Sequence, residues 1–223
     1  MTDGVIDARQ PTPFPDRTFA GRLLAIEIGK LGLADPVVLA LPRGGVPVAV
    51  EVARALDAPL DLVLVRKLGM PDEPEFAAAA VVDGAAAEIV LNEDAIGAAD
   101  LENRYFEKAS ADARREIERR RKLYLAGRQP VPLEGRDLVV VDDGIATGTT
   151  VRAALKALRR KRPRKLILAV PLVAPSVARQ IAREVDLLVA LAIPRRFGAV
   201  GAFYDDFTQL DDDDVIRLLA SVS

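Results

Sequence analysis

The chain has 223 residues, half of them hydrophobic, and a formal net charge of -2 at neutral pH. This length allows one well-buried domain, and the charge gives no general attraction to nucleic acid or to an anionic membrane. The chain contains neither histidine nor cysteine, which excludes disulfides, zinc–thiolate sites and Ser-His or Cys-His nucleophilic enzymes. Without a transmembrane-length apolar run or a signal peptide's apolar core, a cytoplasmic protein is expected.

Apolar strands and helices alternate along most of the chain. Residues 1–15 are expected to be an irregular lead-in, after which Asp16 or Thr18 can cap a helix to about residue 33, with Phe19, Leu23, Leu24, Ile26 and Ile28 on its apolar side. Strands are predicted at 37–41, 60–65, 139–141, 165–173 and 187–193, and helices at 46–56, 151–162, 176–184 and 212–220. Residues 76–82 and 88–91 predict a hairpin. The alternation indicates an α/β fold with a doubly wound, mostly parallel sheet flanked by helices.

The most informative segment is 139–150, with the sequence VVVDDGIATGTT. Its apolar run predicts a buried strand that delivers Asp142 and Asp143 to the carboxyl end of the sheet. A Gly/Thr turn follows, and then a helix start, whose backbone N–H groups and dipole attract a phosphate. Carboxylates repel phosphate but accept hydrogen bonds from sugar hydroxyls or bind a metal ion. A phosphate site beside a diol site fits a ribose 5-phosphate.

This segment resembles the phosphoribosyl pyrophosphate (PRPP) signature of the type I phosphoribosyltransferases. The alternative is an ordinary strand–helix unit with an Asp-Asp turn. A Walker loop is excluded because no lysine follows the second glycine, and a Rossmann fingerprint is excluded by the glycine spacing. The resemblance implies that Asp142 and Asp143 hold the ribose hydroxyls, and that the 5-phosphate is bound by the residues of the turn, which are Ala146, Thr147, Gly148, Thr149 and Thr150.

Two more loops after predicted strands carry cations. Arg43-Gly44-Gly45 resembles the pyrophosphate loop of the family, since glycine lets backbone amides approach a ligand and arginine can clamp phosphate oxygens. Arg66 and Lys67 resemble a pair that contacts pyrophosphate in the orotate-type enzymes, with a mobile loop after it. A solvent-facing arginine in the first loop, and plain surface cations in the second, are the alternatives.

The segment 193–207 holds four of the chain's ten aromatic residues. It resembles the C-terminal hood of purine-type members, which makes Phe197 the candidate to stack on a base and Asp205 the acid of the hood. The alternative is that these aromatic residues only pack together as a small satellite core under a loop.

The chain also departs from the family pattern. Ala146 stands where hypoxanthine-guanine enzymes have an aspartate, and Val173-Ala174-Pro175 stands where they have a lysine that reads the 6-oxo group. These departures put a 6-oxopurine acceptor in doubt, whereas alanine before Thr-Gly is familiar in adenine-type members.

The expected activity is transfer of the 5-phosphoribosyl group of PRPP to a nitrogenous acceptor, most simply a nucleobase, with Mg²⁺ as cofactor. Asp142, Asp143, Arg66 and Lys67 are the expected catalytic residues, and the two acids hold Mg²⁺ indirectly, through PRPP and water. The alternatives are a PRPP-binding regulatory protein without turnover and, less well supported, a phosphate-ester hydrolase, which would need a second acid cluster.

The expected organisation is one domain over 1–223, with a core at 37–193, a helical excursion at 92–128 and a hood at 194–207 followed by the C-terminal helix. The excursion contains one long charged helix over 101–125, with an apolar stripe that packs and a remainder that is solvated. Four acids at 211–214 are expected to favour the dipole of the last helix. A homodimer is expected.

Overall fold

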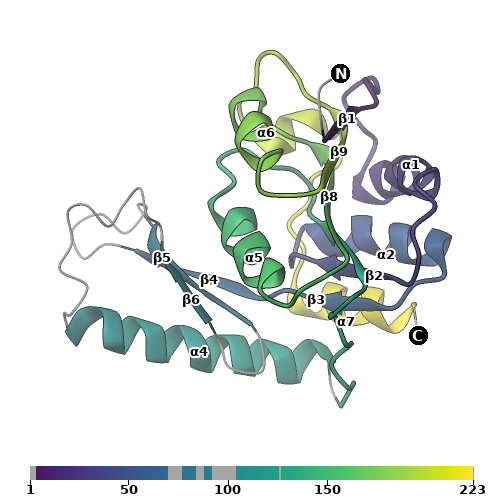
Figure 1. Ribbon diagram of the computed structural model, residues 1–223. Coiled ribbons are helices and arrows are strands. Elements are labelled where there is room, and N and C mark those ends of the chain that lie inside the picture. Colours follow the sequence, from purple (N-terminus) through teal and green to yellow (C-terminus); the bar gives the residue numbers. More distant parts are fainter. Residues whose placement is uncertain (1–3, 70–76, 84–87, 92–103, 126, 223) are drawn as a thin grey trace.

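The computed structural model describes residues 4–69, 77–83, 88–91, 104–125 and 127–222. Its main sheet has six parallel strands (Figure 1). In spatial order they are β1 (Val5–Asp7), β9 (Leu187–Ala192), β8 (Lys165–Leu172), β7 (Asp137–Val141), β2 (Pro36–Ala40) and β3 (Leu60–Leu62). The parallel order confirms the predicted α/β sheet and gathers the loops after these strands along one edge.

Helices cover both faces of this sheet (Figure 1). On one face lie α1 (Arg17–Gly29), α2 (Gly45–Leu56) and α7 (Asp212–Ala220), and on the other lie α5 (Thr149–Arg159) and α6 (Pro175–Ile181). Strand β7 serves both cores, because Val139 and Val141 pack on the α1–α2 side while Leu138 and Val140 pack on the α5–α6 side. Burial on both faces explains why this strand is a continuous apolar run.

A separate antiparallel sheet contains β4 (Val65–Gly69), β5 (Ala77–Val82) and β6 (Glu88–Leu91). The long helix α4 (Arg104–Leu125) lies along it, away from most of the main sheet (Figure 1). Ala113 and Ile117 of its predicted apolar stripe are buried. The predicted hairpin and long helix are therefore confirmed, but the single strand expected at 60–65 is wrong, because β3 and β4 belong to different sheets.

No helix in the described part of the chain is long and apolar enough to span a membrane.

The lead-in and the first helix differ from the prediction. Residues expected to be irregular form β1, a three-residue edge strand paired with β9, too short to give a periodic signal. Asp16 caps α1, since its carboxylate accepts a hydrogen bond from the Phe19 amide at 2.7 Å. The helix ends at Gly29, and Phe19 and Ile26 are exposed. The burial of Leu24 and Ile28 on its apolar side is confirmed, and Ala20, four residues before Leu24, completes this face.

Candidate functional site

Two loops of the predicted site meet at the carboxyl edge of the main sheet. Strands β2 and β7 are neighbours, with Ala40 beside Val141, so the glycine loop and the acidic loop leave the sheet side by side. A Cβ atom on Gly44 would lie 2.0 Å from Oδ2 of Asp143, and one on Gly45 would lie 2.7 Å from the Val141 carbonyl oxygen. Glycine is required at both positions because any side chain would displace the acids or their strand.

Asp143 is held by a buried arginine from the N-terminal helix. The Arg17 Nε atom donates to Oδ2 of Asp143 at 2.7 Å, and the two side chains are 10% and 13% exposed. The same guanidinium donates through Nη1 to the Thr208 carbonyl oxygen at 3.0 Å and lies 3.7 Å from the centre of the Phe207 ring. Arg17 therefore ties three segments together, which are α1, the acidic loop and the hood.

The two acids differ in their electrostatic surroundings. Burial raises the pKa of Asp142 well above its ordinary value, and the neighbouring charge of Asp143 raises it further. Burial also raises the pKa of Asp143, against the opposing effect of the Arg17 hydrogen bond. Even with Arg17 beside Asp143, it is unfavourable for both carboxyl groups to be ionised at once when no ligand is bound. A ligand that offers hydrogen-bond donors or positive charge at this point would relieve that cost.

The start of α5 has the geometry of an anion site. Gly148 has a φ of 76° and precedes the helix, and no side chain caps the first turn. Ala146 and Thr147 are exposed, while Thr149 and Thr150 are half-buried. Such a helix start attracts anions through free amides and the helix dipole. The five residues predicted to bind phosphate therefore lie together, a few residues after the acidic pair.

The predicted cations are less closely gathered. Arg43 follows β2 and faces Asp212 of α7, with Nη1 3.9 Å from Oδ1. Arg66 is exposed on β4, inside the second sheet and not at the end of a strand as expected. Among the described residues it forms no hydrogen bond or ion pair with the acidic pair. The side chain of Lys67 lies outside the described part of the chain.

The hood is an aromatic cluster against the same edge. Phe197 packs on Phe203 with ring centres 5.1 Å apart, and Tyr204 stacks on Phe207 at 5.2 Å. Asp205 is exposed, and its backbone amide donates to the Phe14 carbonyl oxygen at 2.8 Å. The packing role expected as the alternative is present, while base stacking by Phe197 and the role of Asp205 stay predictions.

Two residues that contact the acidic pair were missed by sequence reasoning. Tyr204 is buried and donates its hydroxyl to the Asp143 carbonyl oxygen at 2.6 Å. Burial, followed by the charge of Asp143, raises the pKa of Tyr204, so the phenol stays protonated as a donor. Arg17 stands in the first turn of α1, where the helix dipole disfavours a cation. This unfavourable position is the local signal in the sequence that could have indicated a distant partner for Arg17.

Comparison with known proteins identifies the family. The model of the phosphoribosyl transferase domain matches residues 19–190. The chain belongs to the phosphoribosyl transferase family. A Mycobacterium tuberculosis protein named "Putative phosphoribosyl transferase" is 44% identical over 206 residues, which are 92% of this chain and 46% of that protein. The chain thus spans about half the length of these curated relatives.

One solved structure is similar over nearly the whole chain. The crystal structure of TT1426 from Thermus thermophilus is 44% identical and has a TM-score of 0.82, covering 94% of this chain and 99% of that one. A shorter match, 50% identical over 42 residues, joins 18% of this chain to 24% of the "Bifunctional protein pyrR" of Enterococcus faecalis. The predicted type I phosphoribosyltransferase fold is confirmed.

The acids of this phosphoribosyl transferase chain do not form a complete metal site in the described part of the chain. Among the described residues, no group of three or more acidic side chains could hold a metal ion. Oδ1 of Asp142 accepts from the Asp143 amide at 2.9 Å, and Oδ2 of Asp143 is paired with Arg17. One oxygen of each acid remains for a ligand. Two separate acceptors suit the hydroxyls of a sugar better than the six ligands of a directly bound Mg²⁺ ion.

Proposed function

We propose that this chain transfers the 5-phosphoribosyl group of PRPP to a nitrogenous acceptor, most simply a nucleobase, with release of pyrophosphate. The observation that carries the proposal is the contact between the two loops. Gly44 and Gly45 leave no room for side chains against Asp143 and Val141, and an open helix start follows a few residues later. Backbone amides, two carboxylates and an open helix start thus adjoin one another, which supports the binding of the three parts of PRPP.

The proposed binding mode assigns each part of PRPP to one element. The 5-phosphate binds the amides and hydroxyls at the start of α5, where the dipole favours its charge. The ribose 2- and 3-hydroxyls donate to the free oxygens of Asp142 and Asp143. The pyrophosphate lies over the glycine loop, with Arg43, Arg66 and Lys67 as its proposed cationic partners.

The chemistry then exchanges one bond at C1 of the ribose. The C1–O bond breaks, the electron pair leaves with the pyrophosphate, and a lone pair of the acceptor nitrogen forms the new C1–N bond. The acceptor loses its proton to solvent or to a neighbouring base. Positive charge develops at C1 on the way, and the carboxylates of Asp142 and Asp143 stabilise it. A preorganised group of this kind contributes about 3 kcal/mol to lowering the barrier.

Magnesium is proposed to enter with the substrate. The free oxygens of the acidic pair fit ribose hydroxyls, so the ion would be held mainly by PRPP oxygens and water, with the acids in its outer shell. The chemistry that such an ion would supply is neutralisation of charge on the pyrophosphate, which would make it a better leaving group.

Calorimetry and a turnover assay test the proposal. The parent chain should bind PRPP with Mg²⁺ and release pyrophosphate with at least one base from a panel. Asp142→Asn combined with Asp143→Asn should cut turnover severely while the fold stays intact. The matched control replaces two exposed acids that have no role in the proposed binding mode, Asp57→Asn with Asp213→Asn, and should behave as the parent. Equal rates in both double variants would refute the assigned role.

The alternative is a PRPP-binding regulatory protein. It is favoured by the absence of a purine-reading lysine at 173–175 and by the packing of Phe197 on Phe203. PRPP binding without pyrophosphate release, whichever base is added, would identify it. A homodimer is proposed for either function, and light scattering in solution tests it.

A further inference from the structure

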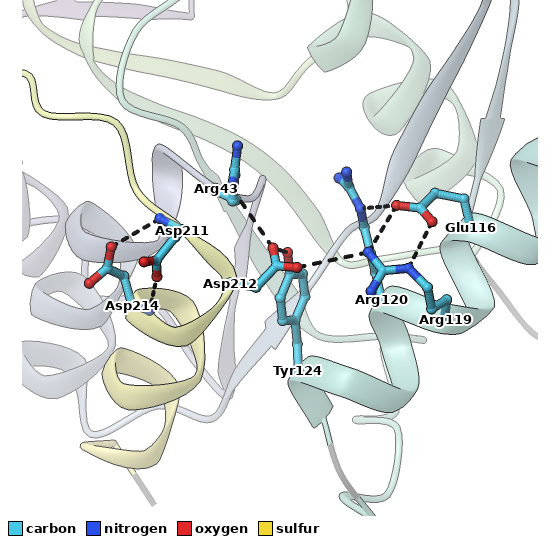
Figure 2. A network of polar contacts seen from close by, with 8 residues as sticks. All are labelled: Arg43, Glu116, Arg119, Arg120, Tyr124, Asp211, Asp212 and Asp214. Atoms are coloured by element: carbon cyan, nitrogen blue, oxygen red, sulfur yellow. Dashed lines mark hydrogen bonds and ion pairs between the residues drawn. The ribbon is translucent and has the colours of Figure 1, made fainter.

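The start of α7 carries an acid that the helix itself does not use. Asp211 caps the helix, since its Oδ1 accepts a hydrogen bond from the Asp214 amide at 2.8 Å. In the opposite direction, the Asp211 amide donates to Oδ2 of Asp214 at 2.9 Å. This reciprocal pair satisfies the cap. Asp212, between them in sequence, points away from the pair toward α4 (Figure 2). Its carboxylate is therefore available for tertiary contacts.

Asp212 joins the long helix α4 to the glycine loop. Tyr124, buried near the end of α4, donates its hydroxyl to Oδ1 of Asp212 at 2.5 Å. Nη1 of Arg43 lies 3.9 Å from that oxygen, and Nη2 of Arg119 lies 3.8 Å from Oδ2 (Figure 2). Burial and the Asp212 hydrogen bond raise the pKa of Tyr124 to about 12. The phenol is thus a permanent donor at neutral pH, and it fixes one oxygen of Asp212.

The other end of α7 is also attached. Arg128, just after α4, donates to the Leu219 carbonyl oxygen at 2.9 Å. Arg54 of α2 donates to the hydroxyl of Ser221 at 2.7 Å. Because α7 is held at both ends, Asp212 has a defined place relative to the glycine loop and does not move with a loose terminus.

Arg43 is held lightly at this point. Asp212 is its only ion-pair partner among the described residues. Nη1 of Arg43 and Oδ1 of Asp212 are 3.9 Å apart, and the two side chains are 34% and 36% exposed, so their attraction is weak. A guanidinium has five N–H donors in a fixed plane, so a single distant carboxylate leaves most of these donors available for another ligand. The contact therefore orients Arg43 without preventing it from binding a second anion.

We propose that Asp212, fixed by Tyr124, is a positioning residue that orients Arg43 toward the pyrophosphate of PRPP. The helical excursion thereby becomes part of the pyrophosphate site, although α4 itself does not touch the substrate. This inference rests on the proposed function, because it needs a pyrophosphate group at the glycine loop.

Two ligands separate the pyrophosphate contact from the rest of the site. Calorimetry with Mg²⁺ compares PRPP with ribose 5-phosphate, which lacks the pyrophosphate. Tyr124→Phe and Asp212→Asn should each weaken PRPP binding by about three- to tenfold, with ribose 5-phosphate affinity unchanged. Asp213→Asn, which removes the same charge from the same exposed turn of α7, is the matched control and should match the parent for both ligands.

A double-mutant cycle excludes a merely structural effect. In an Arg43→Gln background, Tyr124→Phe should have no further effect on PRPP affinity, because the residue that it orients is gone. An undiminished effect there, unchanged PRPP affinity in both single variants, or tighter binding by Asp212→Asn would overturn the inference. If the parent chain does not bind ribose 5-phosphate, the proposed function is overturned, and this inference with it.

Discussion

Replacing Arg17 tests how the acidic pair is held in the folded chain. Arg17→Met keeps most of the side-chain volume but removes the charge beside Asp143, the hydrogen bond to the Thr208 carbonyl oxygen and the contact with the Phe207 ring. Because the two ionic side chains are only 10% and 13% exposed, solvent compensates little. Breaking a buried pair from one side costs about 3 kcal/mol or more in the free energy of unfolding at neutral pH.

The size of this loss should depend on pH. Without Arg17 the folded-state pKa of Asp143 rises further above its unfolded value, so ionisation favours the unfolded chain as pH increases. Below about pH 4 the carboxyl group is protonated in both states. Only the lost ring contact and hydrogen bond then remain, a loss of about 1–2 kcal/mol. The destabilisation is therefore largest at neutral pH and shrinks on acidification.

Urea unfolding at several pH values measures both quantities, with the slope m checked for two-state behaviour. Arg22→Met is the matched control, since Arg22 lies on the same helix and pairs with Glu51 at 3.1 Å while 67% exposed. It should lose at most about 1 kcal/mol. Adding Asp143→Asn to Arg17→Met should recover part of the loss. The reasoning fails if both arginine variants are equally stable, or if the loss is the same at every pH.

Two more substitutions probe the same edge of the sheet. Asp142→Asn should stabilise the fold by about 1 kcal/mol or more at neutral pH, because a carboxyl group whose pKa is raised by burial no longer has to ionise. Thermal unfolding should show that gain disappearing below about pH 4, and a lower Tm at neutral pH would contradict it. Gly44→Ala should abolish PRPP binding in calorimetry, since its Cβ would meet Asp143 at 2.0 Å. Gly29→Ala, which has open space, should bind as the parent does.

Much of the site was predictable because its parts are local in sequence. The strand, the acids, the turn and the helix start lie within residues 139–150, so the pattern specifies both structure and chemistry there. The glycine loop follows the same logic at the end of β2. Arg66 shows the limit of this reasoning, since an apolar run cannot reveal that the chain leaves one sheet and enters another between Leu62 and Val65.

The alternation of strands and helices, the acidic pair and the glycines could be predicted from the amino-acid sequence, because each depends on neighbours a few residues away. Which charges meet depends on long-range packing. Arg17 and Asp143 are 126 residues apart, and Tyr124 and Asp212 are 88 apart. Such pairs form because the parallel sheet and the packing of α7 bring segments together that are distant in the sequence.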